Sequence, residues 1–382
     1  MGNVPPLRFP EFCGEWECTS IGNIGEIKNG PFGSVLHAED YVEEGIPIVT
    51  TEHFKTGLMP SDKFGIPQVS NEDYIRLKGY RLETNDIVFS RVGSVDINAH
   101  VGIEQNGWLF SGRVLRVRPK HDVDSLFLHY ALSTEAVKRD IRNRAVGQTM
   151  PSINTPILSS TTIRLPKELS EQKKVAHFLR LLDERIATQN KIIEDLKILK
   201  SAIAERLFNS TDGDILSLSD VCIIQKGKQV NGEDLSETGK FYVMNGGVEP
   251  SGYYDQCNTP ANTISISEGG NSCGYIQYNR DAFWSGGHCY TLNNIQPNVC
   301  KLYLYHYLKS QESSIMKLRI GTGLPNIQKK DLEKFHILLT SKAIQESISA
   351  FLTTIDRKIT NEDMLLQRFQ KGKQYLLRQM FI

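Results

Sequence analysis

Two segments of this chain, residues 178–208 and 351–381, read as two copies of one long helix. Aligned without a gap, both segments begin and end with Phe, and the offset between them stays constant (351 − 178 = 173 and 381 − 208 = 173). In each copy, apolar residues recur at alternating spacings of three and four, which is the pattern of a helix with one apolar stripe. Two long stripes of the same register most simply cover each other, so the sequence predicts a pair of packed helices.

The apolar seam that we predict between these helices has the same positions in both copies. Its members are Leu182, Ile186, Ile193, Leu196, Ile203 and Leu207 in the first copy and Ile355, Ile359, Leu366, Phe369, Leu376 and Met380 in the second. Each stripe runs further than an average globular helix of about 11 to 12 residues needs. An antiparallel pair would set Leu182 against Met380. The alternative is that each helix packs only on its own domain.

Polar steps along the seam also match, because Gln189 corresponds to Glu362 and Lys200 to Lys373. In the antiparallel register Gln189 would lie opposite Lys373 and form an amide contact. Lys200 would lie opposite Glu362 and form an ion pair, whereas parallel packing would face Lys200 with Lys373. We therefore predict that these two contacts fix an antiparallel register.

The regions before the two helices also repeat each other, in the same order but with drifting spacing. A glycine loop before each helix occupies Gly147–Asn154 in one copy and Gly321–Gln328 in the other. Further upstream, the matching segments are residues 126–132 and 302–308, residues 86–93 and 262–270, and two segments that end at Gly30 and Gly227. Preserved order with variable spacing is expected of duplicated domains whose loops have diverged. The chain is therefore predicted to be a domain followed by a helix, twice.

Short segments rich in β-branched residues and bounded by Gly, Asn or Pro predict strands in both domains. They are Gly45–Thr50, Asn85–Ser90, Arg113–Pro119 and Asn262–Ser267. Helical spacing predicts helices over Ser125–Arg144 and Lys301–Arg319, so the predicted fold class is mixed α/β. The predicted parts are a first domain at 1–165, a first spacer helix at 166–210, a second domain at 211–342 and a second spacer helix at 343–382.

Composition excludes several other kinds of protein. The chain has 382 residues, 40% of them hydrophobic and 23% charged, and a formal net charge of +0, which is ordinary for a globular protein of two or more domains. No apolar run approaches the roughly 18 residues of a membrane helix, and the N-terminal segment lacks the pattern of a signal peptide, so we expect a cytoplasmic protein. The cysteines are scattered and odd in number, which predicts reduced thiols without a disulfide framework or a zinc pair.

Basic residues gather beside both glycine loops. Lys138, Arg139, Arg142 and Arg144 precede the first loop, and Lys317, Arg319, Lys329 and Lys330 surround the second. Clusters of this kind are typical of a surface that contacts the phosphates of a nucleic acid. The alternative is that they are solvated faces of surface helices.

Side chains that could read bases lie in the loops themselves. The DNA-binding candidates are Gln148, Thr149, Ser152 and Asn154 in the first glycine loop, Thr322, Asn326 and Gln328 in the second, Arg91 and Asn271 in two upstream turns, and the basic residues Arg142, Arg144, Lys317 and Arg319. Asn and Gln can bridge adenine, Arg can bridge guanine and Glu can accept from cytosine. Arg91 in one turn and Glu268 in the other would therefore suit two modules that read different bases. The alternatives are a capping turn for each glycine loop and ordinary turn variation for Arg91 and Glu268.

Motifs of the common enzyme classes are missing. The chain has no GxxxxGK[ST] phosphate loop, no HExxH and no Asn/Asp-Pro-Pro-aromatic tetrad of the amino-methyltransferases. Gly270–Gly274 matches GxSxG around Ser272, but residues 275–283 read as a strand, whereas a nucleophile elbow turns into a helix. We therefore expect no catalytic residue and no metal site in this chain.

The order of domain, long helix, domain, long helix resembles the specificity subunit of type I restriction-modification systems. The resemblance is carried by residues 5–17 (PPLRFPEFCGEWE), by the lead into the first helix at 165–186 and by the lead into the second at 341–359. Its most specific element is Ser170–Gln172, and the second copy departs from it with Ile344–Glu346.

The resemblance implies that each domain is a target recognition domain that reads one half of a bipartite sequence in double-stranded DNA. It also implies that the two helices pack as an antiparallel coiled-coil spacer, on which two methyltransferase subunits dock, and that motor-nuclease subunits join for restriction. S-adenosylmethionine would be bound by the methyltransferase partner, whose pocket would receive a target base, typically adenine, after it leaves the stack. No cofactor is then expected in this chain.

The length of the helices predicts the layout of the target. A helix of about 35 residues spans roughly 50 Å at 1.5 Å per residue, against roughly 34 Å per turn of B-DNA. Two half-sites with an unread gap would follow, and the length of the helices would set the gap. Two alternatives from other classes are a coiled-coil scaffold whose domains bind protein or glycan, and an enzyme whose site has no known motif. The sequence leaves open which bases are read.

Overall fold

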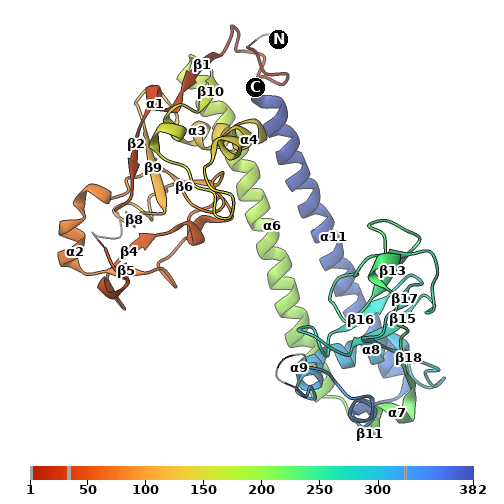
Figure 1. The fold of residues 1–382 in the computed structure, drawn as a ribbon. Helices are drawn as coiled ribbons and strands as arrows, with labels where there is room; N and C mark the ends of the chain where they lie inside the picture. The colour runs from red at the N-terminus through yellow and green to blue at the C-terminus, as the bar shows by residue number, and fades with distance from the viewer. Residues whose placement is uncertain (1–2, 32–35, 322, 324) are drawn as a thin grey trace. The chain divides into compact units, whose positions relative to one another are not determined.

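The computed structural model describes residues 3–31, 36–321, 323 and 325–382, and the chain forms two compact units in it (Figure 1). The first unit consists of Met1–Thr188 with Leu366–Ile382, and the second of Gln189–Leu365. Each unit contains one α/β domain and a part of both long helices, so the predicted fold class is confirmed. Within the described ranges, no helix is both long and apolar enough to cross a membrane.

The first domain is built on small twisted sheets. An antiparallel pair joins β1 (Glu17–Ser20) to β10 (Thr162–Leu165). An antiparallel four-stranded sheet contains, in spatial order, β2 (Gly25–Asn29), β9 (Val114–Pro119), β6 (Ile87–Ser90) and β7 (Asn98–His100). A mixed sheet contains β3 (Tyr41–Val42), β5 (Gln68–Val69), β4 (Ile46–Val49) and β8 (Leu109–Phe110). The strands predicted around β4, β6 and β9 are confirmed.

Short helices connect and cover these strands. They are α1 (Ile21–Ile24), α2 (Asn71–Arg76), α3 (Ser125–Leu132), α4 (Glu135–Arg144) and α5 (Thr155–Ser159), with 3-10 helices η1 (Ala38–Asp40), η2 (Thr51–Phe54) and η3 (Lys78–Tyr80). The single helix predicted over Ser125–Arg144 is therefore two helices. The hydroxyl of Ser133 donates to the carbonyl of His129 at 2.8 Å, and that of Thr134 donates to the carbonyl of Ala131 at 2.8 Å. These side chains take over carbonyls at the end of α3 and stop the helix there.

The second domain repeats this plan. An antiparallel pair joins β11 (Asp214–Ser217) to β19 (His336–Leu339). One sheet contains β12 (Ile223–Lys226), β18 (Cys289–Asn293), β15 (Thr263–Ser267) and β16 (Ile276–Asn279), and another contains β14 (Tyr253–Tyr254), β13 (Phe241–Met244) and β17 (Trp284–Ser285). The helices are α7 (Leu218–Val221), η4 (Gly232–Asp234), α8 (Lys301–Ser310), α9 (Glu312–Met316) and α10 (Lys329–Glu333). The helix predicted over Lys301–Arg319 is again two, α8 and α9.

The strand order shows that the two domains are copies of one fold. The order β2, β9, β6, β7 in the first domain matches β12, β18, β15, β16 in the second, and all neighbours in both sheets are antiparallel. The parallel pair of β4 and β8 matches the parallel pair of β13 and β17. We call two residues equivalent when this repeat places them at the same position of the fold.

Two long helices follow the domains, α6 (Leu169–Asn209) and α11 (Lys342–Met380). In the first unit Asp183 of α6 pairs with Lys373 of α11 at 2.5 Å, and Arg185 lies over the ring of Phe369. Residue numbers thus rise along α6 as the numbers of their partners on α11 fall. The helices pack as an antiparallel coiled coil, as predicted.

The same direction holds in the second unit, where Gln189 of α6 binds Glu362 of α11 and Lys200 pairs with Asp356 at 2.5 Å. The predicted partners were different, with Gln189 opposite Lys373 and Lys200 opposite Glu362, and that register is wrong. Gln189 instead meets its own equivalent, Glu362. The ion pairs Lys200–Asp356 and Lys373–Asp183 are likewise equivalent to each other.

The ends of the long helices explain this register. Met380 and Leu376 pack into the core of the first domain, and Leu207 and Ile203 pack with residues of α8. The last turn of each helix thus also covers a domain, so Met380 is not aligned with Leu182. The twelve predicted seam residues are all buried or half-buried.

Equivalent phenylalanines anchor the two helix ends. The ring of Phe381, which follows α11, packs against Phe127 of α3 with centroids 5.1 Å apart. The ring of Phe208 in α6 packs against Tyr303 of α8 with centroids 5.6 Å apart. The segment before β1 lies beside the end of α11, where the amide of Leu7 donates to the carbonyl of Gln379 at 2.8 Å (Figure 1).

Equivalent glutamines anchor the two helix starts. The side-chain oxygen of Gln172 accepts from the amide of Asp124 at 2.8 Å, and its amide nitrogen donates to the carbonyl of Pro166 at 2.9 Å. Gln345 accepts from the amide of Cys300 at 2.7 Å and donates to the carbonyl of Thr340 at 2.7 Å. Both glutamines are buried, so each one supplies partners for backbone groups that water does not reach.

Candidate nucleic-acid interface

In each unit, the glycine loop lies against the turn that ends the central strand of the sheet. In the first unit the amide of Gly93 donates to the carbonyl of Pro151 at 2.8 Å, and the amide of Ile153 donates to the carbonyl of Arg91 at 2.9 Å. We call residues 90–93 and 146–154 the first patch. The sequence named both segments as candidates, and the structure brings them together.

The second unit has the equivalent arrangement. The amide of Gly270 donates to the carbonyl of Pro325 at 3.0 Å, and the amide of Ile327 donates to the carbonyl of Glu268 at 2.8 Å. We call residues 267–271, 320, 321, 323 and 325–328 the second patch. Thr322 is a predicted member of it that lies outside the described residues.

Each glycine loop is closed by its own backbone. Val146 and Ser152 exchange amide hydrogen bonds of 2.9 and 2.8 Å, and Ile320 and Asn326 exchange bonds of 2.8 and 3.0 Å. The glycine that opens the loop has a positive φ in both copies, 101° at Gly147 and 96° at Gly321. A residue with a Cβ rarely adopts this conformation, which explains the glycine at both positions.

Some of the predicted base-reading side chains of the first patch are exposed, and others bind the backbone of their own domain. Gln148 and Thr149 are exposed at the loop tip. Ser152 donates back to the carbonyl of Val146 at 3.3 Å. The side chain of Asn154 accepts from the amide of Ile157 at 3.0 Å and caps α5, as the capping alternative predicts for this residue.

In the second patch, Asn271, Asn326 and Gln328 are all exposed. The side-chain amide nitrogen of Gln328 donates to the side-chain oxygen of Asn326 at 3.0 Å, so these two side chains form one polar group on the surface. Gln328 occupies the N-cap position of α10 without a side-chain capping bond. Both amides of this pair are thus placed where a ligand could reach them.

The arginines predicted to contact phosphates in the first unit bind their own domain. Arg142 pairs with Asp96 at 2.5 Å and also with Glu135. Arg144 pairs with Asp140 and donates to the hydroxyl of Ser160 at 2.9 Å. Both guanidinium groups therefore hold α4 in place.

The basic residues of the second unit are arranged differently. Lys317 and Arg319 are exposed, and neither forms an ion pair with any other described residue. Lys329 pairs with Glu333 along α10 at 3.5 Å. Lys317 and Arg319 are therefore placed beside the second patch where they could meet phosphates.

Residues that sequence reasoning did not select surround Glu268 in the second patch. Lys226 pairs with one oxygen of its carboxylate at 2.7 Å, and the hydroxyl of Tyr290 donates to the same oxygen at 2.9 Å. The Nδ1 of His288 lies 3.7 Å from the other oxygen. Burial and the neighbouring carboxylate raise the pKa of Tyr290, which keeps its hydroxyl protonated. The repeat that aligns Gly30 with Gly227 places Lys226 beside the patch and could have identified it.

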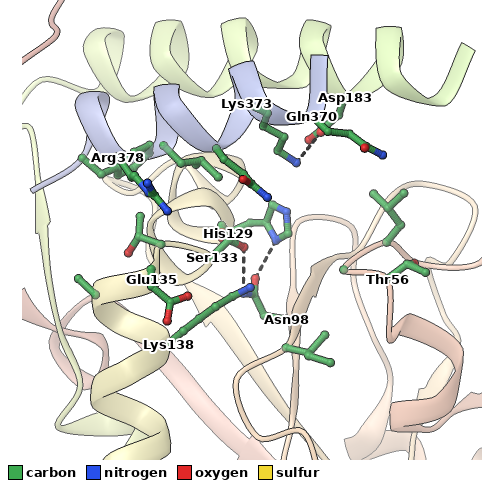
Figure 2. Close-up of a pocket in the computed structure, with 18 of the residues that line it drawn as sticks. Thr56, Asn98, His129, Ser133, Glu135, Lys138, Asp183, Gln370, Lys373 and Arg378 are labelled. Atoms are coloured by element: carbon green, nitrogen blue, oxygen red, sulfur yellow. Dashed lines mark hydrogen bonds and ion pairs between the residues drawn. The ribbon is translucent and has the colours of Figure 1, made fainter. Parts of the chain in front are cut away.

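The first unit also contains a cavity of about 820 Å³ between its domain and the long helices (Figure 2). His129 on α3 donates from Nδ1 to the side-chain oxygen of Asn98 at 2.7 Å. The side-chain nitrogen of Asn98 donates to the hydroxyl of Ser133 at 3.2 Å. Burial lowers the pKa of His129 to about 3, so its imidazole is neutral. The hydroxyl of Ser133 donates to a backbone carbonyl and not to the imidazole, so the pair is not a nucleophile with its base.

Other groups with catalytic potential are placed for packing. Ser272 sits in a turn followed by the strand β16, as predicted, and not in a strand-to-helix elbow. Within the part of the chain that the structure describes, no group of three or more His, Cys, Asp or Glu side chains could hold a metal ion.

Comparisons with known proteins agree with this architecture. The model of the type I restriction modification DNA specificity domain matches residues 14–197 and again residues 212–368. A putative type I specificity subunit of Mycoplasma genitalium is 35% identical over 41% of this chain, and the match spans 42% of that protein. A putative type I restriction enzyme specificity subunit of Methanocaldococcus jannaschii is 25% identical over 98% of this chain and 95% of its own length. The crystal structure of a type I restriction-modification S subunit from M. genitalium covers 99% of both chains, with a TM-score of 0.66 and 19% identity.

Proposed function

Because the chain belongs to the family of type I restriction-modification DNA specificity subunits, we propose that it reads a bipartite DNA sequence for a methyltransferase complex. The first domain would read one half of the target and the second domain the other half. The observation that carries this proposal is the pair of patches. They have the same backbone contacts and different side chains, as two readers of different half-sites need.

The partners that we propose are two copies of one methyltransferase subunit, with motor-nuclease subunits added for restriction. Phe178 of α6 and Phe351 of α11 are equivalent residues, and their side chains are 39% and 51% exposed. Leu181, three residues after Phe178 on α6, is 49% exposed as well, and neighbouring exposed apolar side chains can form a contact site for another protein. Equivalent positions on two helices suit two identical partners.

Chemistry belongs to these partners in the proposed complex. S-adenosylmethionine would bind in the methyltransferase subunit, and a base flipped out of the duplex would react there. The residues of this chain would bind and orient the DNA. The same division of labour would place this chain with DNA in the cytoplasm.

The long helices would set the distance between the half-sites. They have 41 and 39 residues, which gives lengths of roughly 60 Å at 1.5 Å per residue. Inserting about one helical turn, ~4 residues, after Lys197 should lengthen the unread gap and leave both half-sites unchanged. Sequencing of methylated bases in a host that carries the variant measures the gap. An unaltered gap would show that helix length is not the ruler.

The test of the function itself is the pattern of methylation in a host with and without this chain. Expressed together with its methyltransferase subunit, the chain should direct methylation to one bipartite motif that disappears when the chain is deleted. Methylation that persists without the chain, or that follows no bipartite motif, would refute the proposal. Binding of duplex DNA by the same complex should weaken steeply with salt.

A further inference from the structure

The two patches carry opposite charges at one equivalent position. Arg91 follows β6, and its amide donates to the carbonyl of Arg113 at 3.0 Å. Glu268 follows β15, and its amide donates to the carbonyl of His288 at 2.9 Å. The backbone therefore places both side chains alike, at the point where each glycine loop meets its sheet.

The carboxylate of Glu268 is fixed before any ligand arrives. Only 11% of the side chain is exposed, and Oε1 accepts from Lys226 at 2.7 Å and from Tyr290 at 2.9 Å. Lys226 and Tyr290 face each other across β12 and β18, so the sheet itself positions both donors. This arrangement leaves Oε2 as the oxygen that points to other partners.

Oε2 of Glu268 has no hydrogen-bond donor among the described residues, although it is buried. The ring nitrogen Nδ1 of His288 lies 3.7 Å from Oε2, which is too far for a hydrogen bond. The side chain of His288 is 63% exposed. A buried acceptor without a donor costs free energy, and such a group is commonly completed by a ligand or by water.

The first domain has an unpaired acceptor at the position equivalent to Lys226, and not at that of Glu268. Asn29 faces Leu115 across β2 and β9, as Lys226 faces Tyr290 in the second domain. The side-chain oxygen of Asn29 is buried and also has no hydrogen-bond donor among the residues that the structure describes.

We propose that Glu268 is a specificity-determining residue of the second domain, whose Oε2 accepts a hydrogen bond from the exocyclic amino group of one base. Cytosine N4 and adenine N6 are the amino donors in the major groove. This inference rests on the proposed function and adds the group that reads one position of one half-site. His288 would move aside as the base approaches.

The substitution that tests this is Glu268→Gln. The amide oxygen of Gln would stay with Lys226 and Tyr290, which both donate, so the amide nitrogen would replace Oε2. The variant would then present a hydrogen-bond donor, the side-chain amide nitrogen, at the position of the acceptor Oε2. We expect discrimination for the amino base to fall by about tenfold or more at one position of one half-site, with a shift toward guanine or thymine, whose major-groove edges carry keto oxygens.

Sequencing of methylated bases in a host carrying the complete methyltransferase complex gives the motif of each variant. The base lost from the motif shows whether the donor is cytosine or adenine. Glu312→Gln is the matched control, because this carboxylate in the same unit accepts from the amide of Ile276 at 2.8 Å and from Lys309 at 2.5 Å. The control should keep the motif. An active Glu268→Gln complex with the unchanged motif would overturn the inference, and so would the same motif change in the control.

A second measurement alters the DNA. The wild-type complex is titrated with duplexes in which one base at a time lacks its exocyclic amino group. We expect about a tenfold loss of affinity at one position, and no further loss at that position with Glu268→Gln. Equal affinity for all duplexes would overturn the inference, whereas a wild-type complex without any bipartite motif would refute the proposed function instead.

Discussion

The two units use different side chains for the same contact between domain and helix. In the first unit the hydroxyl of Tyr130 donates to Asp183 of α6 at 2.8 Å. In the second, the equivalent His306 lies with Nδ1 3.9 Å from Asp356 of α11, which is equivalent to Asp183. Both aspartates also bind an equivalent lysine of the opposite helix. The aspartate and its lysine are thus retained, while the residue of the domain beside them varies and only Tyr130 donates a hydrogen bond to the aspartate.

The patches show a different kind of divergence. Their backbone contacts are retained, but the charge at the equivalent position is reversed between Arg91 and Glu268. Conserved contacts therefore hold the scaffold together, whereas the side chains free to diverge lie where the domains would meet DNA. Each prediction below separates these two roles.

Exchanging a whole domain has the largest expected effect. Replacing residues 1–165, which include the whole first patch, with the corresponding domain of another family member should change one half-site completely and leave the other half-site and the gap intact. The physical reason is that each unit has its own core and its own patch. Sequencing of methylated bases checks this, and a change in both half-sites would mean that the units do not read independently.

Acid should destabilise both units through their buried histidines. Burial lowers the pKa of His129 to about 3 and that of His306 to about 4, whereas an unfolded histidine titrates near 6.5. As the pH falls below about 6.5 the unfolded chain takes up protons first, so stability is full above that pH and is lost toward pH 4. Between pH 6.5 and pH 4, each histidine should lower the free energy of unfolding by on the order of 3 kcal/mol, which urea unfolding measures.

The variant His306→Tyr sharpens this comparison, because it gives the second unit the residue of the first. Its hydroxyl could donate to Asp356 as Tyr130 does to Asp183, and a cavity of about 660 Å³ beside His306 offers room. The free energy of unfolding that is lost in acid should then be smaller by about the contribution of one histidine. An unchanged pH dependence would show that His306 does not control it.

Removing either anchoring glutamine should lower the free energy of unfolding by a similar amount. Gln172→Ala and Gln345→Ala each leave a buried amide and a buried carbonyl without a partner, which should cost about 2–3 kcal/mol. Urea unfolding of both variants tests the equivalence. A large cost for one and none for the other would show that the two helix starts are not held alike.

The smallest effect is expected for the equivalent ion pairs. Lys200→Met and Lys373→Met should each cost about 1 kcal/mol, because both lysines and both aspartates are partly exposed. The difference from wild type should shrink in high salt, since salt screens such pairs. A much larger cost for one variant would indicate that its aspartate is left buried without a partner.

Features repeated along the chain were accessible from the sequence because each copy supports the other. The two apolar stripes predicted the helix pair, and the loops at Gly147 and Gly321 predicted two surfaces of the same design. Asn154 shows the limit of this reasoning, because an amide in a glycine loop suits either a base or a helix cap. Its bond to the amide of Ile157 is a local contact that the residue type alone does not reveal.

The sequence by itself determined the duplication, the order of the parts and the pair of long helices, since these depend on patterns within continuous segments. Only the tertiary structure decided the register, in which Gln189 meets Glu362, because the helix ends pack on the domains as well as on each other. It also decided the surroundings of Glu268. Lys226 and Tyr290 are far from Glu268 in sequence, and the sheet brings them together by hydrogen bonding between β12, β18 and β15.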